Sequence, residues 1–191
     1  MSGEDEHATP LAPAEREGLI PSHITLRSEL NEVEQSNILT GTSWAFSRKR
    51  DPFNEAFLRG LHRRMFDEVW RWAGEYRTTD RNFGVESWRI ATEVQSVLSD
   101  VRYWMANKTY SSDEIAVRYH HSLVSVHPFA NGNGRWSRLA ADLAIVALGR
   151  PGFTWGRSRL HAPSDTRRAY IDALKAADNH DFAPLIAFVR S

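Results

Sequence analysis

The sequence contains no cysteine among its 191 residues. Disulfides, thiolate zinc sites and cysteine nucleophiles are therefore excluded. The chain also has no net charge, because 24 basic side chains balance 24 acidic ones. Proteins that bind nucleic acid or anionic membranes usually carry a basic excess, so we expect neither partner. The chain has no apolar run long enough for a signal peptide or a membrane span, and we expect a cytoplasmic location.

The length allows one hydrophobic core and is short for two ordinary domains. The first residues are acidic and polar, so we expect a flexible tail over residues 1–16. Residues 17–50 carry loosely spaced apolar side chains, typical of an N-terminal extension with one or two short helices. Residues 51–191 form the expected core domain.

Helical periodicity dominates that core, so the predicted fold is mainly α. Apolar stripes run through residues 57–69, 94–105, 115–126, 135–148, 170–177 and 185–189. The exception lies between Tyr76 and Thr92, where β-prone residues surround Asn82-Phe83-Gly84. That pattern predicts a short β-hairpin beside the helical bundle.

The richest chemistry lies in His127-Pro128-Phe129-Ala130-Asn131-Gly132-Asn133-Gly134-Arg135-Trp136-Ser137-Arg138. Pro128 disfavours the helical conformation at His127 and leaves the imidazole at a helix end. The two glycines allow main-chain N–H groups to converge on an anion, and a helix beginning at the arginines adds partial positive charge. Arg135 and Arg138 lie three residues apart on one face, where both guanidiniums can reach a polyphosphate. Asn-Gly-Asn-Gly by itself also suits a surface turn.

This string resembles the signature of the Fic family, His-Pro-Phe-x-(Asp/Asn/Glu)-Gly-Asn-(Gly/Lys)-Arg-x-x-Arg, and matches all nine constrained positions. The resemblance implies an all-helical Fic fold and transfer of AMP from ATP to a Ser, Thr or Tyr hydroxyl of a target protein. It implies that His127 deprotonates that hydroxyl, and that Phe129 anchors the turn in the core. It further implies that the phosphates are bound by Gly132, Asn133, Gly134, Arg135 and Arg138.

Asn131 stands at the metal position of that signature. Many relatives have a carboxylate there, and Mg²⁺ prefers hard anionic oxygens. An amide oxygen is a weaker ligand, but the triphosphate supplies others. We therefore expect Mg²⁺ dependence and leave the metal affinity open.

A second string, Trp72-Ala73-Gly74-Glu75-Tyr76-Arg77, resembles the Trp-Ala-Gly-x-x-Arg sequence found before the flap of Fic proteins. The resemblance implies that the predicted hairpin is a flap that docks an extended segment of the target by main-chain hydrogen bonds. Its residues would be Phe83, Gly84, Val85, Glu86, Ser87 and Trp88.

The N-terminal extension contains Thr25-Leu26-Arg27-Ser28-Glu29-Leu30-Asn31, which resembles the inhibitory (Ser/Thr)-x-x-x-Glu-(Gly/Asn) motif of many Fic proteins. By that resemblance Glu29 would pair with Arg138 in place of a γ-phosphate. A shifted frame makes Glu32 the alternative acid. Acidic residues on a polar helix face are otherwise ordinary solvated charges.

The region from about residue 17 to 190 also resembles the mobile mystery protein B group of bacterial Fic proteins, encoded beside a small helix-turn-helix protein. That resemblance implies a toxin–antitoxin setting and a possible helix-turn-helix partner.

Three alternatives remain. The chain could transfer another phosphate-containing group, although the phosphate-transferring relatives usually carry Lys at the position of Gly134. It could be a nucleotide-binding module with little activity, because Asn131 replaces a carboxylate. A zinc site at His120, His121 and His127 has unsuitable spacing. For the nucleoside, Tyr170 and Trp155 are the candidate contacts.

Overall fold

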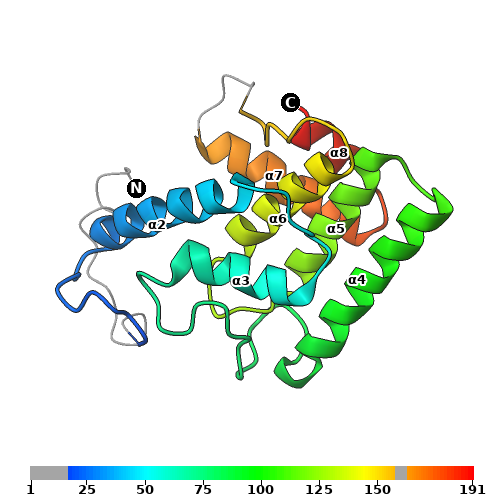
Figure 1. Ribbon diagram of the computed structural model, residues 1–191. Helices are drawn as coiled ribbons and strands as arrows, with labels where there is room; N and C mark the ends of the chain where they lie inside the picture. Colours follow the sequence, from blue (N-terminus) through cyan, green and yellow to red (C-terminus); the bar gives the residue numbers. More distant parts are fainter. Residues whose placement is uncertain (1–16, 158–162) are drawn as a thin grey trace.

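The computed structural model describes residues 17–157 and 163–191, so the tail predicted over residues 1–16 lies outside the described residues. The chain is mainly helical, as the periodicity predicts (Figure 1). The helices are α2 (Arg27–Phe46), α3 (Glu55–Phe66), α4 (Ile90–Asn107), α5 (Ser112–Val126), α6 (Asn133–Ala147), α7 (Pro163–Asp178) and α8 (Ala183–Val189), with a short 3₁₀ helix, η2 (Ser87–Arg89). Among the described helices, none has the length and hydropathy needed to cross a membrane.

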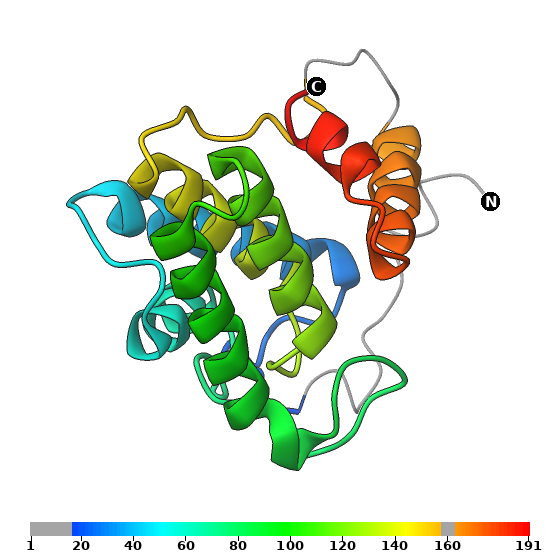
Figure 2. The same ribbon diagram turned by 90° about the vertical axis from the view of Figure 1, so that its right-hand side faces the viewer.

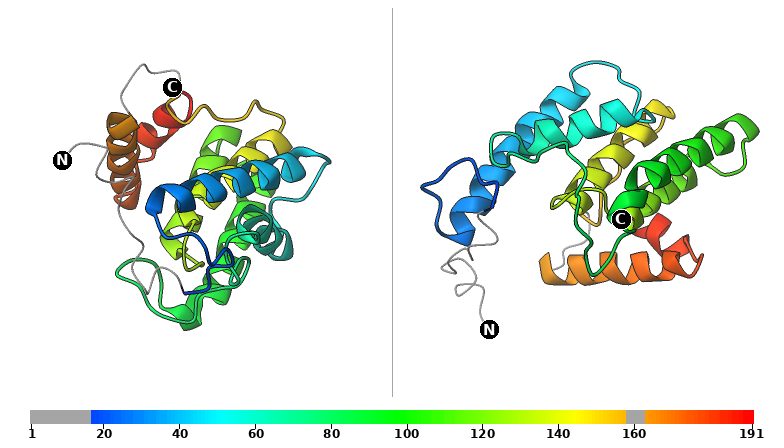
Figure 3. Two further views of the ribbon diagram at one scale, coloured as in Figure 1. Left: turned by 90° about the vertical axis from the view of Figure 1, so that its left-hand side faces the viewer. Right: turned by 90° about the horizontal axis from the view of Figure 1, so that it is seen from below.

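Seen from below, the helices lie in three layers (Figure 3). The antiparallel pair α2 and α3 forms one outer layer, and the pair α7 and α8 forms the other. Between them, α4, α5 and α6 lie side by side (Figure 2). The turn between α5 and α6 carries the His127 motif, so the middle layer positions the candidate site.

The N-terminal extension forms one long helix, α2, where the sequence suggests one or two short ones. Its buried face is built largely from polar and small side chains, among them Glu34, Asn37 and Gly41. A Cβ at Gly41 would lie 2.7 Å from the carbonyl oxygen of Arg64, so glycine lets α2 approach α3 closely. Asn37 reinforces the contact, because its Nδ2 donates to that same carbonyl.

Residues close in sequence determine where α5 ends and α6 begins, and so fix both ends of the motif turn. Helix α5 starts where the Ser111 hydroxyl accepts a hydrogen bond from the Glu114 N–H, and ends at His127, whose φ is +52°. Pro128 follows and cannot continue the helix. Helix α6 starts after Gly132, whose φ of +79° suits glycine.

The predicted β-hairpin does not form among residues 77–89, which contain bends and η2 but no strand. The reason is that its main-chain groups bond elsewhere. Arg77 donates through its guanidinium to the carbonyls of Thr79 and Val85, and the Val85 N–H donates to Val126 O. We refer to residues 78–88 as the flap loop, which projects beside the start of α4 (Figure 2).

Candidate active site

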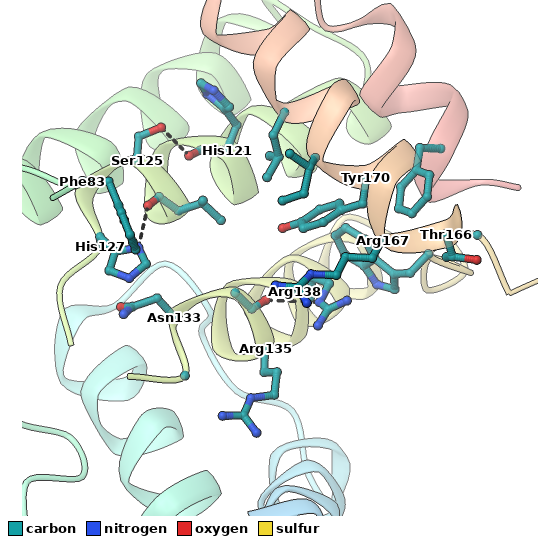
Figure 4. A pocket seen from close by; sticks show the side chains of 18 of the residues that line it. Phe83, His121, Ser125, His127, Asn133, Arg135, Arg138, Thr166, Arg167 and Tyr170 are labelled. Carbon is teal, nitrogen blue, oxygen red and sulfur yellow. Dashed lines mark hydrogen bonds between the residues drawn. The ribbon is translucent and has the colours of Figure 1, made fainter. Parts of the chain in front are cut away.

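A cavity of about 1140 Å³ opens between α5, α6, α7 and the flap loop (Figure 4). Most of the residues predicted to carry the chemistry line it, namely His127, Asn131, Gly132, Asn133, Gly134, Arg135 and Arg138. The predicted nucleoside contacts Tyr170 and Trp155 line it too, as do Phe83 and Gly84 of the flap loop. The structure therefore brings together residues that the sequence places up to 87 positions apart.

His127 lies at the wall of this cavity. Its Nδ1 is 3.4 Å from Val124 O, and the ring of Phe83 packs edge-on against it with 4.5 Å between centroids. Burial, together with the positive charges of Arg77 and Arg81, lowers the pKa of His127 below its usual value. The imidazole is therefore neutral near pH 7, in the form that accepts a proton.

Asn133 and the two glycines of the motif have different roles in the turn. The buried Asn133 side chain accepts from Phe129 N at 2.9 Å and donates to Phe129 O at 2.8 Å, so it closes the turn. A Cβ at Gly132 would lie 2.5 Å from Phe66. A Cβ at Gly134 would meet no atom within 4 Å. The fold thus requires glycine at 132 and leaves position 134 open toward the cavity.

Arg138 points toward Tyr170 of α7 (Figure 4). Its Nε donates to Gly134 O at 3.2 Å, and its guanidinium lies 5.6 Å from the centre of the Tyr170 ring. Burial is the main cause that lowers its pKa. The buried His120 holds Tyr170, with 2.9 Å between Nε2 and the hydroxyl. The cavity therefore contains a desolvated cation beside an aromatic ring, a setting that favours an anionic group next to a flat one.

Arg135 has a different environment. Its Nη1 donates to Glu34 Oε2 at 2.6 Å, and Trp70 Nε1 donates to Glu34 Oε1 at 2.7 Å. Glu34 is only 3% exposed, so this carboxylate of α2 is a buried partner for a motif arginine. In Figure 4 the Arg135 side chain points away from Arg138.

The expected pairing of Glu29 with Arg138 is not present. Glu29 is exposed, and its carboxylate accepts from the N–H groups of Thr25 and Leu26 at the start of α2. These main-chain bonds lower its pKa. The reason is local: Leu26 has no side-chain acceptor for the helix end, and the third helical residue supplies one. The alternative acid, Glu32, is exposed.

Asn131 stands at the position that the sequence predicts for a metal ligand, and it lines the cavity. Its Oδ1 accepts from the Gly132 N–H at 2.7 Å. Within residues 17–157 and 163–191, no group of three or more His, Asp or Glu side chains is arranged to hold an ion. These residues fit Mg²⁺ only if phosphate oxygens provide the other ligands.

The flap loop is held to the motif by Arg77. This side chain is almost fully buried, and its Nε donates to His127 O at 2.8 Å in addition to the two flap carbonyls. Glu86, Ser87 and Trp88 lie outside the cavity, and Trp88 is 81% exposed. The two flap residues nearest His127 are therefore Phe83 and Gly84.

The histidines other than His127 make separate contacts. His120 is buried against Tyr170 and Trp155, whereas His121 bonds Asp178 of α7 with 2.8 Å between Nε2 and Oδ1. Both histidines therefore connect α5 to the outer layer formed by α7 and α8.

Several cavity residues lack a signal in the sequence. Thr166 and Arg167 line the wall from α7, and Arg157 from the loop before it. The stripe of Tyr170, Ile171 and Leu174 looks like a core face, but it lines the cavity, and Ile171 is 39% exposed. Only the cluster of polar residues one turn before that stripe could have indicated a ligand-facing helix.

Comparison with known proteins gives a consistent result. Residues 52–145 match the model of the Fic/DOC family. Protein adenylyltransferase fic-1 of Caenorhabditis elegans is 30% identical over 149 residues, which are 75% of this chain and 28% of that protein. Protein adenylyltransferase Fic of Drosophila virilis is 29% identical over 68% of this chain and 26% of its own length. The matches therefore span about a quarter of these curated relatives.

Solved structures share the fold. The BepC protein of Bartonella tribocorum with bound AMPPNP has a TM-score of 0.69 at 18% identity, covering 94% of this chain and 97% of that one. The Fic domain of a cell filamentation protein of Bartonella quintana with bound ADP has a TM-score of 0.70 at 18% identity, covering 88% and 86%.

Proposed function

Residues 52–145 belong to the Fic/DOC family, and on this premise we propose that the chain transfers AMP from ATP to a Ser, Thr or Tyr hydroxyl of a target protein. One observation carries the proposal: a neutral histidine, an open glycine turn and a desolvated arginine line a single cavity. The adenylyltransferase names of the curated relatives and the AMPPNP and ADP bound in the two Bartonella structures support it.

In the proposed reaction, His127 accepts the proton of the target hydroxyl. The hydroxyl oxygen then forms a bond to the α-phosphorus while the bond from that phosphorus to the bridging oxygen of pyrophosphate breaks. General-base assistance of this kind contributes roughly 10²–10⁴ in rate. Main-chain N–H groups at the start of α6 and the Arg138 guanidinium offset the phosphate charge.

Mg²⁺ fits this proposal as an ion held by Asn131 Oδ1 and phosphate oxygens, where it would neutralise charge on the triphosphate. Asn131 Oδ1 now accepts from the Gly132 N–H, and we propose that it turns toward the ion when the nucleotide binds. That N–H would then be free for a phosphate oxygen.

We further propose that Glu34, in place of Glu29, is the N-terminal acid that restrains the enzyme. A carboxylate that already binds Arg135 competes with the triphosphate for this arginine. The restraint is released when α2 shifts or when Glu34 loses its charge.

The experiment that tests AMP transfer is incubation of the protein with α-labelled ATP and Mg²⁺, alone and in bacterial lysate. We expect labelled protein bands that disappear in His127→Ala. Nucleotide binding with no labelled band would favour the inactive binding module, and label from γ-labelled ATP instead would favour phosphate transfer. Labelling that persists in His127→Ala would refute the proposed base.

The restraint is tested with Glu34→Gln, which keeps an acceptor for Trp70 and removes the charge. We expect tighter ATP binding and faster labelling, because Arg135 becomes available to the phosphates. Glu29→Gln is the matched control and should leave both quantities unchanged. Equal ATP affinity in Glu34→Gln and the parent would show that the pair is purely structural.

A further inference from the structure

His62 of α3 is fully buried beneath the motif turn, and it does not line the cavity. Both of its ring nitrogens are used. Nδ1 lies 3.0 Å from the Gly74 N–H nitrogen, and Nε2 lies 3.0 Å from the Asn131 carbonyl oxygen. The ring stacks on Phe129 with 3.7 Å between centroids. One side chain therefore connects the Trp72-Ala73-Gly74 segment to the middle of the motif.

These contacts define one protonation state. The Gly74 N–H is a donor, so Nδ1 must present its lone pair. The Asn131 carbonyl is an acceptor, so Nε2 must carry the proton. Burial lowers the pKa of His62 to about 3, which keeps the ring neutral at every pH where the protein is expected to work.

The bond to Asn131 has a consequence for the next residue. In a trans peptide, the C=O of one residue and the N–H of the next point in opposite directions. Because the Asn131 carbonyl is directed at His62, the Gly132 N–H is directed away from His62, toward its partner Asn131 Oδ1 on the cavity side. Glycine tolerates either sign of φ, and Gly132 has a φ of +79°, so the residue itself does not hold the peptide between Asn131 and Gly132 in one orientation.

We infer that His62 is a positioning residue: it fixes the orientation of the Asn131–Gly132 peptide and so presents the Gly132 N–H to a phosphate oxygen of the bound nucleotide. The inference deepens the proposed function and rests on it for the identity of the ligand. Gly74 contributes to this arrangement: its φ of +81° suits glycine, and its N–H donates to Nδ1.

Two variants separate the hydrogen bonds from the packing. His62→Phe keeps a flat ring against Phe129 and loses both hydrogen bonds. His62→Gln keeps an acceptor and an N–H donor at a spacing close to that of the two ring nitrogens. We expect His62→Phe to bind ADP roughly tenfold to a hundredfold more weakly, the range for a lost hydrogen bond to a charged group, with adenosine affinity unchanged. His62→Gln should recover most of the ADP affinity.

The comparison of ADP with adenosine isolates the phosphates, so a general loss of folded protein would weaken both and would contradict the inference. Equal ADP affinity in His62→Phe and the parent would also overturn it. These binding measurements do not depend on AMP transfer. If labelling fails while the ADP pattern holds, the proposed function is wrong and the role of His62 stands.

The unmodified protein provides a test that needs no variant. In ¹⁵N-labelled protein, NMR should show the proton of the His62 ring on Nε2 and a lone pair on Nδ1. A ring that carries its proton on Nδ1 would overturn the inference.

Discussion

Gly132 and Gly134 are glycine for different physical reasons. At 132 a side chain would collide with Phe66 and would force an L residue to a φ of +79°. At 134 the protein leaves the space open, and the residue already has a helical environment at the start of α6. Gly132 is therefore required by the fold, whereas Gly134 leaves space for a ligand in the cavity.

We therefore predict that Gly134→Lys changes the free energy of unfolding by less than about 0.5 kcal/mol, as for an exposed substitution, yet strongly weakens nucleotide binding. Gly132→Ala should cost about 1–3 kcal/mol for backbone strain, before any cost of the clash. Urea unfolding and AMPPNP titration of both variants measure the two effects. A Gly134→Lys protein that binds AMPPNP normally would contradict this assignment.

His127 leads to a prediction about pH. Because its pKa is lowered, chiefly by burial, the neutral base persists to lower pH than the usual value of about 6.5. The rate of AMP transfer should thus stay flat as pH falls through 6.5 and decline only below it. Arg81→Gln removes a positive charge and should move the decline toward higher pH. A midpoint above 6.5 in the pH profile of kcat/KM would refute the prediction.

At the scale of secondary-structure elements, the pair of Glu34 and Arg135 joins α2 to α6. Arg135→Ala would leave the buried Glu34 carboxylate with Trp70 as its remaining partner among the residues that the structure describes, and we expect a loss of about 3–5 kcal/mol in stability. Adding Glu34→Gln to Arg135→Ala should recover a large part of that loss, because no buried charge remains unpaired. A double-mutant cycle in urea unfolding measures the coupling, and additive losses would contradict it.

The elements differ in how well the sequence predicts them. Helices α5 and α6 could be predicted because an apolar stripe, a Ser cap, a proline and glycines all indicate the same boundaries. Helix α2 was harder, since its contact with α3 is made by Glu34, Asn37 and Gly41 and has no apolar periodicity. The flap loop was wrongly predicted as a hairpin. Its β-prone residues say nothing about Arg77, whose side chain takes the carbonyls that a hairpin would pair.

At the scale of the whole molecule, two buried histidines make stability depend on pH. Burial lowers the pKa of His62 and of His120 to about 3, whereas both rings titrate near 6.5 when unfolded. Between these values the unfolded chain binds more protons, so acid favours unfolding. We predict that the free energy of unfolding falls below pH 6.5, approaching about 1.4 kcal/mol per pH unit for each histidine.

Urea titrations at pH 7, 6 and 5 measure that slope. His62→Gln cannot take up this proton and should show a smaller slope than the parent. An identical slope in both proteins would mean that His62 is not neutral in the folded state.

In the candidate site, the contiguous residues could be predicted from the sequence, whereas the partners that are distant in the sequence could not. The residues from His127 to Arg138 could be read from the sequence, because adjacent positions share one turn and their chemistry is visible in their order. The partners of that turn come from other layers: Glu34 from α2, His62 from α3 and Tyr170 from α7. Such contacts depend on how helices pack. That explains why the sequence motif points to Glu29, whereas the acid that contacts a motif arginine in the structure is Glu34.

Arg77 has a mechanical consequence. Its three donor nitrogens join the carbonyls of Thr79, Val85 and His127, so the flap loop and the end of α5 are fastened to one rigid, nearly solvent-free guanidinium. A protein that grips the flap loop therefore also pulls on the segment that carries the imidazole. If a target docks on the flap loop, as the family resemblance implies, its binding is coupled through Arg77 to the position of the His127 ring, against which Phe83 packs edge-on.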